Sequence, residues 1–507
     1  ANPQLTGGIC LAMSAVFFIP VYLRTRIFTI PGFLENRYSK PTKLIYCITM
    51  VCFGLFMSSI VLYTGSLVIL QLFGFSEDMI FHCSLVLGIA VGIYAIIGGL
   101  SSVVYTDLIQ SVILLIGGFL VMWMAAGFAM LEAGLVRSKN VSVQCLKNIG
   151  LYSIAGLMFW VIGYSIAYPG FEGGYFGIAD FPYAMQAVGE ADTETGYSVA
   201  SDWFFQMVFC ATTASIVSGT VAERIKIVPF FIFVTVLTGF IYPVIVSWEW
   251  GAGWLDAMGF SDFAGSTLVH STGGWAALMG ALIIGPRLGR YTSKGMAVFP
   301  GSSIPLATLG TFILWLGWFG FNGASQLAMG TIGDVSDVSK IFVNTNMAAC
   351  AGVVVAIILT QLRYGKADTT MALNGALAGL VAITAEPLTP NVGMAIIIGG
   401  IGGALPVIFV PLLDKLKIDD VVGAIPVHLV AGIWGTLAVP LTNTEVPFVA
   451  QITGVAATGV FVCATSSIIW FALKATIGVR PSEEEEIAGL DIGETGIEAY
   501  PEFSRGT

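Results

Sequence analysis

Long apolar stretches recur along almost the whole chain, and short polar or charged stretches separate them. Most are close to the ~20 residues that a helix needs to cross a bilayer. None shows the strict alternation of polar and apolar positions that a membrane barrel requires. Because a helix satisfies its own backbone hydrogen bonds in lipid, the pattern predicts an all-α polytopic membrane protein. We place spans near 8–23, 44–71 and 81–99, and then near 112–136, 150–168, 203–222, 229–247, 266–285, 301–322, 341–362, 371–385, 393–412, 423–440 and 449–475.

Composition agrees with a protein of many spans. The chain is 56% apolar and 10% charged, whereas a soluble domain carries roughly 25% charge. The net charge of −10 arises largely from residues 172–202 and from the tail 481–507, so it gives no indication of nucleic-acid binding. We expect this tail to be solvated in the cytoplasm, where a regulator could bind it.

Basic residues in the loops of the block 112–480 alternate between the two sides. They follow the first, third, fifth, seventh, ninth and eleventh spans, and only Lys340 falls on the other side. The positive-inside rule therefore places the start of the block outside and its tail inside, in the plasma membrane. The basic residues counted are Arg137, Lys139, Lys147, Arg224, Lys226, Arg287, Arg290, Lys294, Arg363, Lys366, Lys415, Lys417, Lys474 and Arg480.

Two of the three histidines end the same motif. The pattern D-x-x-G-x-x-x-V-H runs over 262–270 and again over 420–428. An ionisable side chain within a span is costly, and it is a functional hypothesis by default. Because His270 lies on an inward span and His428 on an outward one, we expect two inverted five-helix halves whose histidines meet near the midplane. The alternative is a structural role in the core, while zinc binding lacks partners at ligand spacing.

The first 111 residues do not fit this orientation. A basic cluster between residues 24 and 43 should be cytoplasmic. Counting the spans that follow the cluster then places the start of the span near 112 in the cytoplasm, whereas the block 112–480 requires that start to lie outside. Either the basic cluster lies outside, or one segment is re-entrant, or the connection between the first 111 residues and the block that follows is not a natural one. Residues 9–125 resemble the sodium/solute symporter family, and the segments 29–38 and 98–110 carry this resemblance. The resemblance covers about four of that family's helices, and it makes a sodium-coupled symporter one alternative function.

Several long motifs of the larger block occur in the order found in the Amt/Mep/Rh ammonium transporter family, which residues 112–507 resemble. The resemblance implies an eleven-helix inverted-repeat (5+5+1) fold, here preceded by about three extra transmembrane helices. It divides the chain into a symporter-like fragment 1–111, an ammonium transporter domain 112–480 and the tail 481–507. The motifs span 126–140, 219–224, 262–270, 317–322 with Ser325, 378–381, 419–428, and 489–491 with 498–500.

The resemblance also implies roles for individual residues. Trp250 and Ser325 match an external ammonium-recruitment site, and Trp faces attract cations; alternatively, Trp250 is an interfacial belt residue. Phe209 and Phe321 match stacked rings that close the pore, where Phe209 also contacts the substrate, and simple helix packing is the alternative. Asp262 matches an acid near the recruitment site, but a helix N-cap is an equally good interpretation.

His270 and His428 match the twin histidines that line the pore of that family. Neutral imidazoles in a dry conduit can hydrogen-bond to each other and to ammonia. Leu429, which follows the second histidine, is bulkier than the residue often found there, so it either narrows the pore or faces lipid.

The resemblance implies a homotrimer that captures ammonium outside, removes a proton and conducts ammonia. A second rival is an ammonium sensor. No enzymatic motif, cofactor site or metal site is evident.

Overall fold

The computed structural model describes residues 34–35, 37–73, 79–170, 172–179, 191–192 and 197–504. The chain forms two compact units, Ala1–Val103 and Val104–Thr507, and the boundary between them falls within helix α5 (Ile80–Leu135). The predicted span 8–23 lies outside the described residues. The predicted spans 81–99 and 112–136 both lie in α5, and no break separates them.

In the first unit, helix α4 (Lys40–Phe73) contains the predicted span 44–71 and contacts the start of α5. The Ser84 hydroxyl donates to Ser66 Oγ at 2.9 Å. A methyl group on Gly88 would meet the Leu62 side chain at 3.6 Å. These contacts form a small helical pair, which is consistent with two apolar segments that cover each other in lipid.

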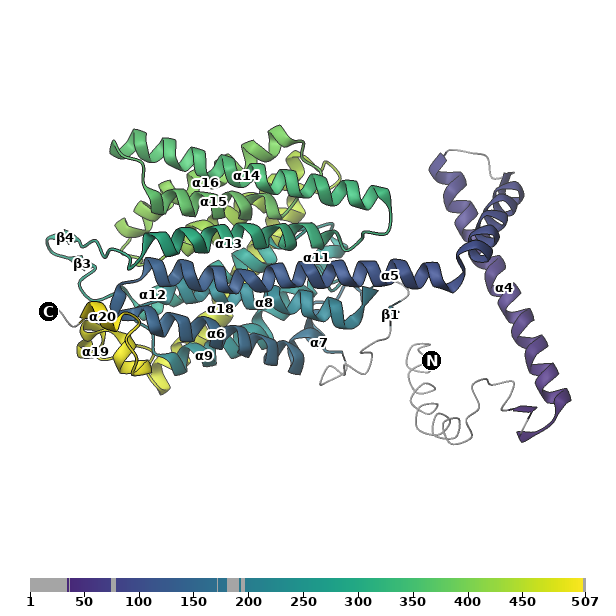
Figure 1. The fold of residues 1–507 in the computed structure, drawn as a ribbon, viewed down its shortest axis with the longest axis horizontal. Helices are drawn as coiled ribbons and strands as arrows, with labels where there is room; N and C mark the ends of the chain where they lie inside the picture. Colours follow the sequence, from purple (N-terminus) through teal and green to yellow (C-terminus); the bar gives the residue numbers. More distant parts are fainter. Residues whose placement is uncertain are drawn as a thin grey trace. The chain divides into compact units, whose positions relative to one another are not determined.

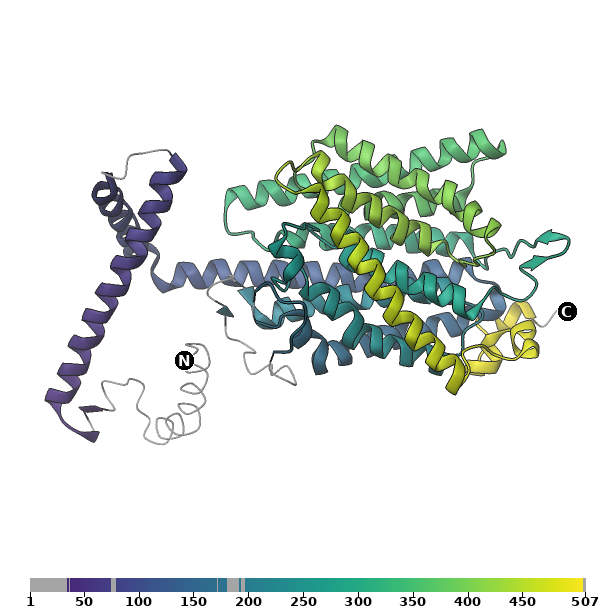
Figure 2. The same ribbon diagram turned by 180° about the vertical axis from the view of Figure 1, so that it is seen from behind.

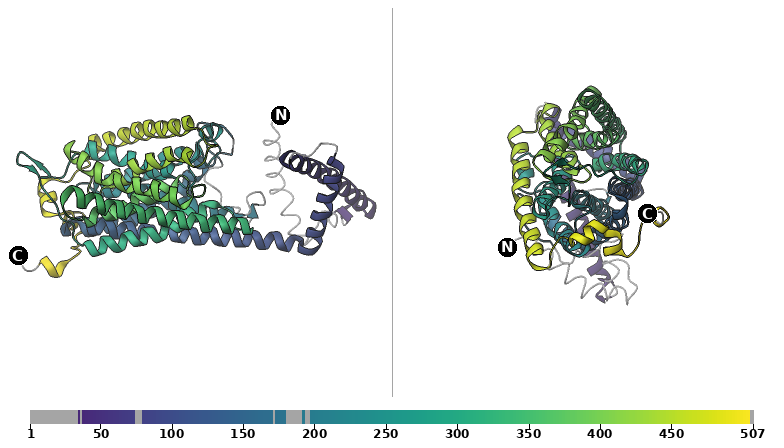
Figure 3. Two further views of the ribbon diagram at one scale, coloured as in Figure 1. Left: turned by 90° about the horizontal axis from the view of Figure 1, so that it is seen from above. Right: turned by 90° about the vertical axis from the view of Figure 1, so that its left-hand side faces the viewer.

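All eleven spans predicted after residue 111 are helical in the second unit. Figure 1 shows its long helices running side by side. Figure 2, which is the view from behind, shows the yellow-green helix α18 crossing the near face obliquely. An end-on view of the bundle is given in Figure 3. In chain order the spans are α5, then α6 (Val141–Met158) with η4 (Phe159–Gly163) and α7 (Tyr164–Ala167), α8 (Val199–Val221), α9 (Ile227–Val236) with η6 (Leu237–Ile241) and α10 (Tyr242–Ser247), η7 (Ser266–Ser271) with α12 (Thr272–Ile284), α13 (Ile304–Gly323), α14 (Ile332–Tyr364), α15 (Thr369–Thr384), α16 (Val392–Lys415), η9 (Ile425–Val430) with α17 (Ala431–Ala438), and α18 (Phe448–Thr476).

The remaining elements are short and lie in the connections. Two-residue strands form two antiparallel hairpins, and short helices lie in the loops and in the C-terminal segment. They are η3 (Ser138–Asn140), β1 (Ala191–Asp192), β2 (Tyr197–Ser198), α11 (Trp254–Ala257), β3 (Tyr291–Thr292), β4 (Gly295–Met296), η8 (Ala324–Gln326), η10 (Val439–Leu441), α19 (Glu483–Ala488), η11 (Asp491–Thr495) and α20 (Pro501–Ser504).

Local sequence explains where several helices begin. Ser198 caps α8 by accepting the Ser201 N–H at 3.2 Å. Thr331 and Asp334 form a reciprocal capping box at the start of α14. Asp368 accepts two backbone N–H groups at the start of α15. Each cap satisfies donors that the first turn of a helix leaves unpaired.

Lys147 was predicted in a loop, and that prediction is wrong. Helix α6 begins at Val141, nine residues before the predicted span, and Lys147 is fully buried in it. Its Nζ lies 3.1 Å from Glu132 Oε1 and also donates to Gln144 Oε1 at 2.7 Å. A hydropathy count treats such a lysine as a loop residue, because the buried carboxylate that compensates it lies on another helix.

The expectation of a solvated tail is also wrong for two of its carboxylates. Glu486 and Asp491 are each 2% exposed. Asp491 accepts the N–H groups of Val141 and Val143 at the start of α6, and Glu486 accepts the Leu288 N–H at 2.7 Å. The acidic segment therefore packs on the loops, because its carboxylates satisfy backbone donors there.

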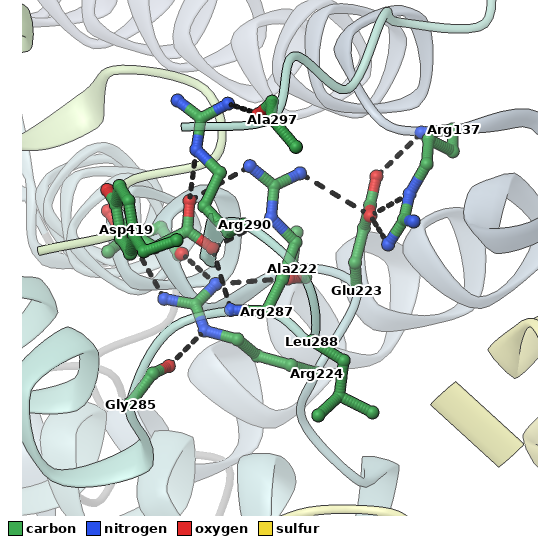
Figure 4. A network of polar contacts seen from close by, with 12 residues as sticks. Arg137, Ala222, Glu223, Arg224, Gly285, Arg287, Leu288, Arg290, Ala297 and Asp419 are labelled. Atoms are coloured by element: carbon green, nitrogen blue, oxygen red, sulfur yellow. Dashed lines mark hydrogen bonds and ion pairs between the residues drawn. The ribbon is translucent and has the colours of Figure 1, made fainter. Parts of the chain in front are cut away.

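A network of buried charges joins the loops at this same end of the second unit, as shown in Figure 4. Glu223 pairs with Arg137 at 2.5 Å and with Arg287 at 3.4 Å, and Arg287 makes two hydrogen bonds of 2.8 and 2.9 Å to Asp419. Arg224 is fully buried and donates to the Asp419 carbonyl, and burial lowers its pKa to about 10. It therefore remains charged at neutral pH, and its backbone acceptors compensate that charge.

Candidate functional site

A cavity of about 430 Å³ opens among α7, α8 and the segments that follow α10 and α13. Figure 1 shows α7 and α11 at the end of the second unit far from α19 and α20. The walls of the cavity are mostly aromatic, and no described residue that lines the cavity carries a positive charge. Trp250, Ser325 and Phe209, which the sequence places at a recruitment site, all line it.

Trp250 and Ser325 present complementary groups to this cavity. The Trp250 indole donates its N–H to the Asp262 carbonyl at 3.0 Å, which fixes the ring orientation. The Ser325 hydroxyl donates to the Phe321 carbonyl at 2.7 Å. Because that proton is committed, the hydroxyl oxygen keeps lone pairs that can accept an N–H from a cation. An aromatic face and an acceptor oxygen therefore line the same cavity.

The phenyl ring of Phe209 lines the cavity and stacks on a second ring, that of Phe321. The centroids of Phe209 and Phe321 are 4.0 Å apart with 29° between the ring planes. Both side chains are almost completely buried. The Phe209 ring also packs edge-on to Trp250, at a centroid distance of 6.0 Å. Rings in van der Waals contact leave no opening between them, so a solute can pass only if a ring moves.

The two histidines lie directly below these rings. The centroid of His270 is 5.3 Å from that of Phe321, and its Nδ1 is 3.1 Å from Nδ1 of His428. The expectation that the imidazoles of the two repeats meet is thus confirmed. One Nδ1 must donate and the other accept, and His270 Nε2 is buried without a partner.

The local backbone of the two repeats explains this approach. Each histidine lies in a π-helical turn, η7 or η9, and such turns occur often at functional sites. A glycine follows each histidine by four residues. A methyl group on Gly274 would lie 2.6–2.8 Å from Leu429, mostly against its backbone, and one on Gly432 would lie 2.4 Å from the Ser266 carbonyl oxygen. Only glycine allows the two segments to cross this closely.

Asp262 caps the start of a helical turn, as the N-cap interpretation of the sequence predicts. It is completely buried, and its two carboxylate oxygens accept the N–H groups of four consecutive residues, 265–268, at 2.7–3.0 Å. It does not line the cavity. Asp262 therefore holds the start of η7, and through that turn it positions His270.

Leu429 does not face lipid. It is 4% exposed and belongs to the apolar core around α12 and α18. Leu429 lies against Gly274 of the other histidine-bearing segment, so it packs between the two segments.

Sequence reasoning missed other side chains at the site. Trp318 stacks on His270 at a centroid distance of 5.0 Å and donates to Thr384 Oγ1 at 2.8 Å. Tyr164, Asp202 and Gln206 line the cavity. Helical spacing could have indicated the last two, because positions 202 and 206 lie on the same face of α8 as Phe209.

Comparison with known proteins places these features in a family. The family model described as Ammonium Transporter Family matches residues 112–500. The chain belongs to this family. It is 40% identical over 420 residues to the ammonium transporter Amt2 of Archaeoglobus fulgidus, which covers 77% of this chain and 87% of the relative. It is also 40% identical over 399 residues to the putative ammonium transporter sll1017 of Synechocystis, covering 77% and 89%.

Solved structures support the same assignment of fold. The structure titled "Sensor Amt Protein" superposes with a TM-score of 0.73 at 34% identity, covering 77% of this chain and 99% of that one. The crystal structure of Candida albicans Mep2 superposes with a TM-score of 0.68 at 25% identity, covering 77% and 90%.

A model of the sodium:solute symporter family matches residues 5–187, and its last part overlaps the ammonium transporter match. The predicted resemblances of both parts of the chain are therefore confirmed. Among the described residues, no group of three or more His, Cys, Asp or Glu side chains is arranged to hold a metal ion.

Proposed function

We propose that this protein transports ammonium and ammonia across a membrane through the second unit. The observation that supports this most directly is the unbroken series of contacts from the cavity inward. Trp250 contacts Phe209, Phe209 stacks on Phe321, Phe321 stacks on His270, and His270 lies 3.1 Å from His428. An aromatic entry, a closed ring pair and a buried imidazole pair thus follow one another. The named ammonium transporters among the relatives support the same function.

In this mechanism the cavity attracts the cation and the rings below it reject its charge. Trp250 offers a π face, worth ~0.5–2 kcal/mol for a cation, and Ser325 offers an acceptor oxygen. A charged ion cannot enter the apolar contact between Phe209 and Phe321 without a large desolvation cost. Ammonium can release a proton to solvent in the open cavity and pass as ammonia, whereas K⁺ has no proton to lose.

The histidine pair then serves as a hydrogen-bonding track. A neutral imidazole offers one donor and one acceptor. In the contact between the two rings, one Nδ1 donates and the other accepts. His270 Nε2 remains as a buried polar group that can form a hydrogen bond to a passing ammonia. The ammonia molecule regains a proton beyond His428, on the side of the buried charge network.

We also propose the arrangement of the protein in the cell. The basic loops gather with the C-terminal segment at one end of the second unit, and this end would face the cytoplasm. The cavity would then face outward from the plasma membrane. We further propose that three copies of the chain form a homotrimer and that a regulator contacts the C-terminal segment. Within each chain we propose a symporter-like fragment 1–111, an ammonium transporter domain 112–480 and the tail 481–507.

Uptake of labelled methylammonium by cells that lack their own ammonium transporters tests the proposed function. We expect cells with the full chain to show saturable uptake that ammonium inhibits. The variant His270→Ala with His428→Ala should change the rate or the selectivity against K⁺. Binding of ammonium without uptake would favour a sensor, and sodium-dependent uptake of another solute would favour a symporter.

A further inference from the structure

A buried ion pair lies in the inner half of the second unit, and the proposed transport steps do not use it. Glu132 of α5 and Lys147 of α6 are both completely buried, and Lys147 Nζ lies 3.1 Å from Glu132 Oε1. The same ammonium group donates to the Ser218 carbonyl of α8 at 3.0 Å and lies 4.9 Å from the centroid of the Phe230 ring. Charged side chains within spans are costly, so such a pair is a functional hypothesis by default.

Ser218 connects this ion pair to α8 through its side chain as well. Its hydroxyl lies 2.9 Å from Glu132 Oε2 and 3.1 Å from Oε1, and Asn148 Nδ2 also donates to Oε2, at 2.8 Å. A hydrogen bond to an ionised acceptor is roughly twice as strong as a neutral one. The carboxylate therefore holds the inner end of α8 at Ser218.

The next residue along α8, Gly219, lies under two apolar side chains. A methyl group on Gly219 would lie 2.6 Å from Val422 Cγ2 and 3.2 Å from Phe128 Cζ, so both side chains rest directly on its backbone. Both are almost completely buried, and the centroid of the Phe128 ring is 6.5 Å from that of His428. Phe128, Gly219 and Val422 thus form an inner closure, which a molecule meets when it leaves His428 toward the basic loops.

Thr220 links the same end of α8 to the segment that carries His428. Its hydroxyl donates to Asp420 Oδ1 at 3.0 Å, and Asp420 Oδ2 accepts the Ile425 N–H at 2.7 Å where η9 begins. Three consecutive residues of α8 therefore contact the ion pair, the inner closure and the acid that caps the second histidine-bearing turn.

We propose that the ion pair of Glu132 and Lys147 positions the inner closure through Ser218, and that it thereby limits how fast ammonia leaves the histidines. This inference rests on the proposed transport function and adds positioning residues to it. The two apolar side chains must separate before a molecule can pass them, because atoms in van der Waals contact leave no opening. A weaker link at Ser218 would let the inner closure open more often, so the maximal rate of transport would rise.

The competing explanation is that the ion pair only joins α5, α6 and α8. Breaking a buried ion pair is strongly destabilising whether or not the pair acts on a pore. That role would change the stability of the protein and the amount that reaches the membrane. It would leave the rate per folded transporter unchanged, so transport kinetics separate the two roles.

Ser218→Ala tests the link while both charges stay paired. The assay measures methylammonium uptake by the full chain, and K⁺ flux beside it, normalised to protein in the membrane. We expect a maximal rate about two- to tenfold above that of the wild type, as loss of one hydrogen bond implies. KM should not change, because Phe209 at the outer cavity lies about 14 Å away along α8. K⁺ should remain excluded, because the outer ring pair is untouched.

Ser215→Ala is the matched control. Ser215 is buried on the same helix, one turn earlier, and its hydroxyl donates to the Ala211 carbonyl of that helix at 3.2 Å. This variant should transport at the wild-type rate. A further variant, Glu132→Gln with Lys147→Met, removes both charges together and leaves no lone buried charge. It should also raise the maximal rate, because a neutral amide holds the Ser218 hydroxyl less strongly than a carboxylate does.

A wild-type or lower maximal rate in Ser218→Ala would overturn the proposal, as would an equal rise in Ser215→Ala or a wild-type rate in the doubly neutral variant. A rise accompanied by K⁺ passage would also overturn it, because general loosening of the pore would then explain the result. Absence of saturable uptake in the wild type would instead contradict the transport function itself.

Discussion

Replacing Gly274 with Ala should separate the two histidines. Gly274 follows His270 by one helical turn, and a methyl group there would lie 2.6–2.8 Å from the Cβ, N and Cα atoms of Leu429, where 3.4 Å is an ordinary contact. Two of those three atoms are backbone, so no side-chain rotation relieves the clash. The segments must therefore move apart by about 0.7 Å. Such a shift along the line between the rings would stretch the Nδ1–Nδ1 distance of 3.1 Å beyond hydrogen-bond range.

Two measurable effects follow from this displacement. Overpacking of this kind costs about 1–3 kcal/mol, which should lower the melting temperature in detergent by several degrees. Loss of one hydrogen bond is worth about 0.5–1.5 kcal/mol, which corresponds to about a two- to tenfold change in the rate of methylammonium uptake. We therefore expect Gly274→Ala to be both less stable and slower than the wild type.

Gly156→Ala is the matched control. Gly156 also lies within a helix, α6, but a methyl group there would meet only Met207 Sδ, at 3.8 Å. This variant should be as stable as the wild type or slightly more stable, because Ala favours helix over Gly. If both variants behave alike in stability and uptake, the close crossing does not hold the histidine pair together, and the argument fails.

Other predictions concern separate parts of the molecule. Trp250→Leu should raise the KM for methylammonium about two- to thirtyfold, as the loss of a cation–π contact implies, and an unchanged KM would remove Trp250 from the recruitment site. Asp262→Ala should lower the melting temperature markedly, since four backbone N–H groups lose their acceptor. Burial opposes ionisation of Asp419, but Arg287 and Arg224 outweigh it and hold the pKa of that carboxyl well below its usual range. The stability that ionised Asp419 contributes should therefore be present above about pH 4 and be lost as the pH falls further. The melting-temperature difference between wild type and Asp419→Asn should accordingly be constant from about pH 8 to about pH 5 and shrink in more acidic buffer. A chain that begins near residue 104 should retain uptake if the second unit folds alone, and loss of uptake with normal membrane insertion would show that the first unit is needed.

The features predicted from the sequence are those whose signal is local or repeated. Apolar runs locate the eleven predicted spans of the second unit, each of which is helical. Among the described residues nine of these helices are long and apolar enough to cross a bilayer, and the helices at Thr369–Thr384 and Ile425–Leu441 are shorter. The repeated motif around His270 and His428 predicts their meeting, because an inverted repeat places equivalent residues on facing helices.

The features that were missed depend on partners distant in sequence. Lys147 is buried because Glu132, on another helix, compensates its charge. Glu486 is shielded from solvent because the N–H of Leu288 in a loop binds it, and Asp491 because N–H groups at the start of α6 bind it. Asp202 belongs to none of the sequence motifs, so its place at the site is evident only from the cavity that it lines.

Flux through the purified protein in sealed liposomes tests the central claim most directly. If the rings of Phe209 and Phe321 reject charge and the histidines conduct ammonia, an inward ammonium gradient should produce protein-dependent ammonium uptake while an equal K⁺ gradient produces no K⁺ flux. The variant His270→Ala with His428→Ala should lose either that rate or that discrimination. Equal passage of both ions through the wild type, or a double variant identical to it in rate and selectivity, would contradict the account.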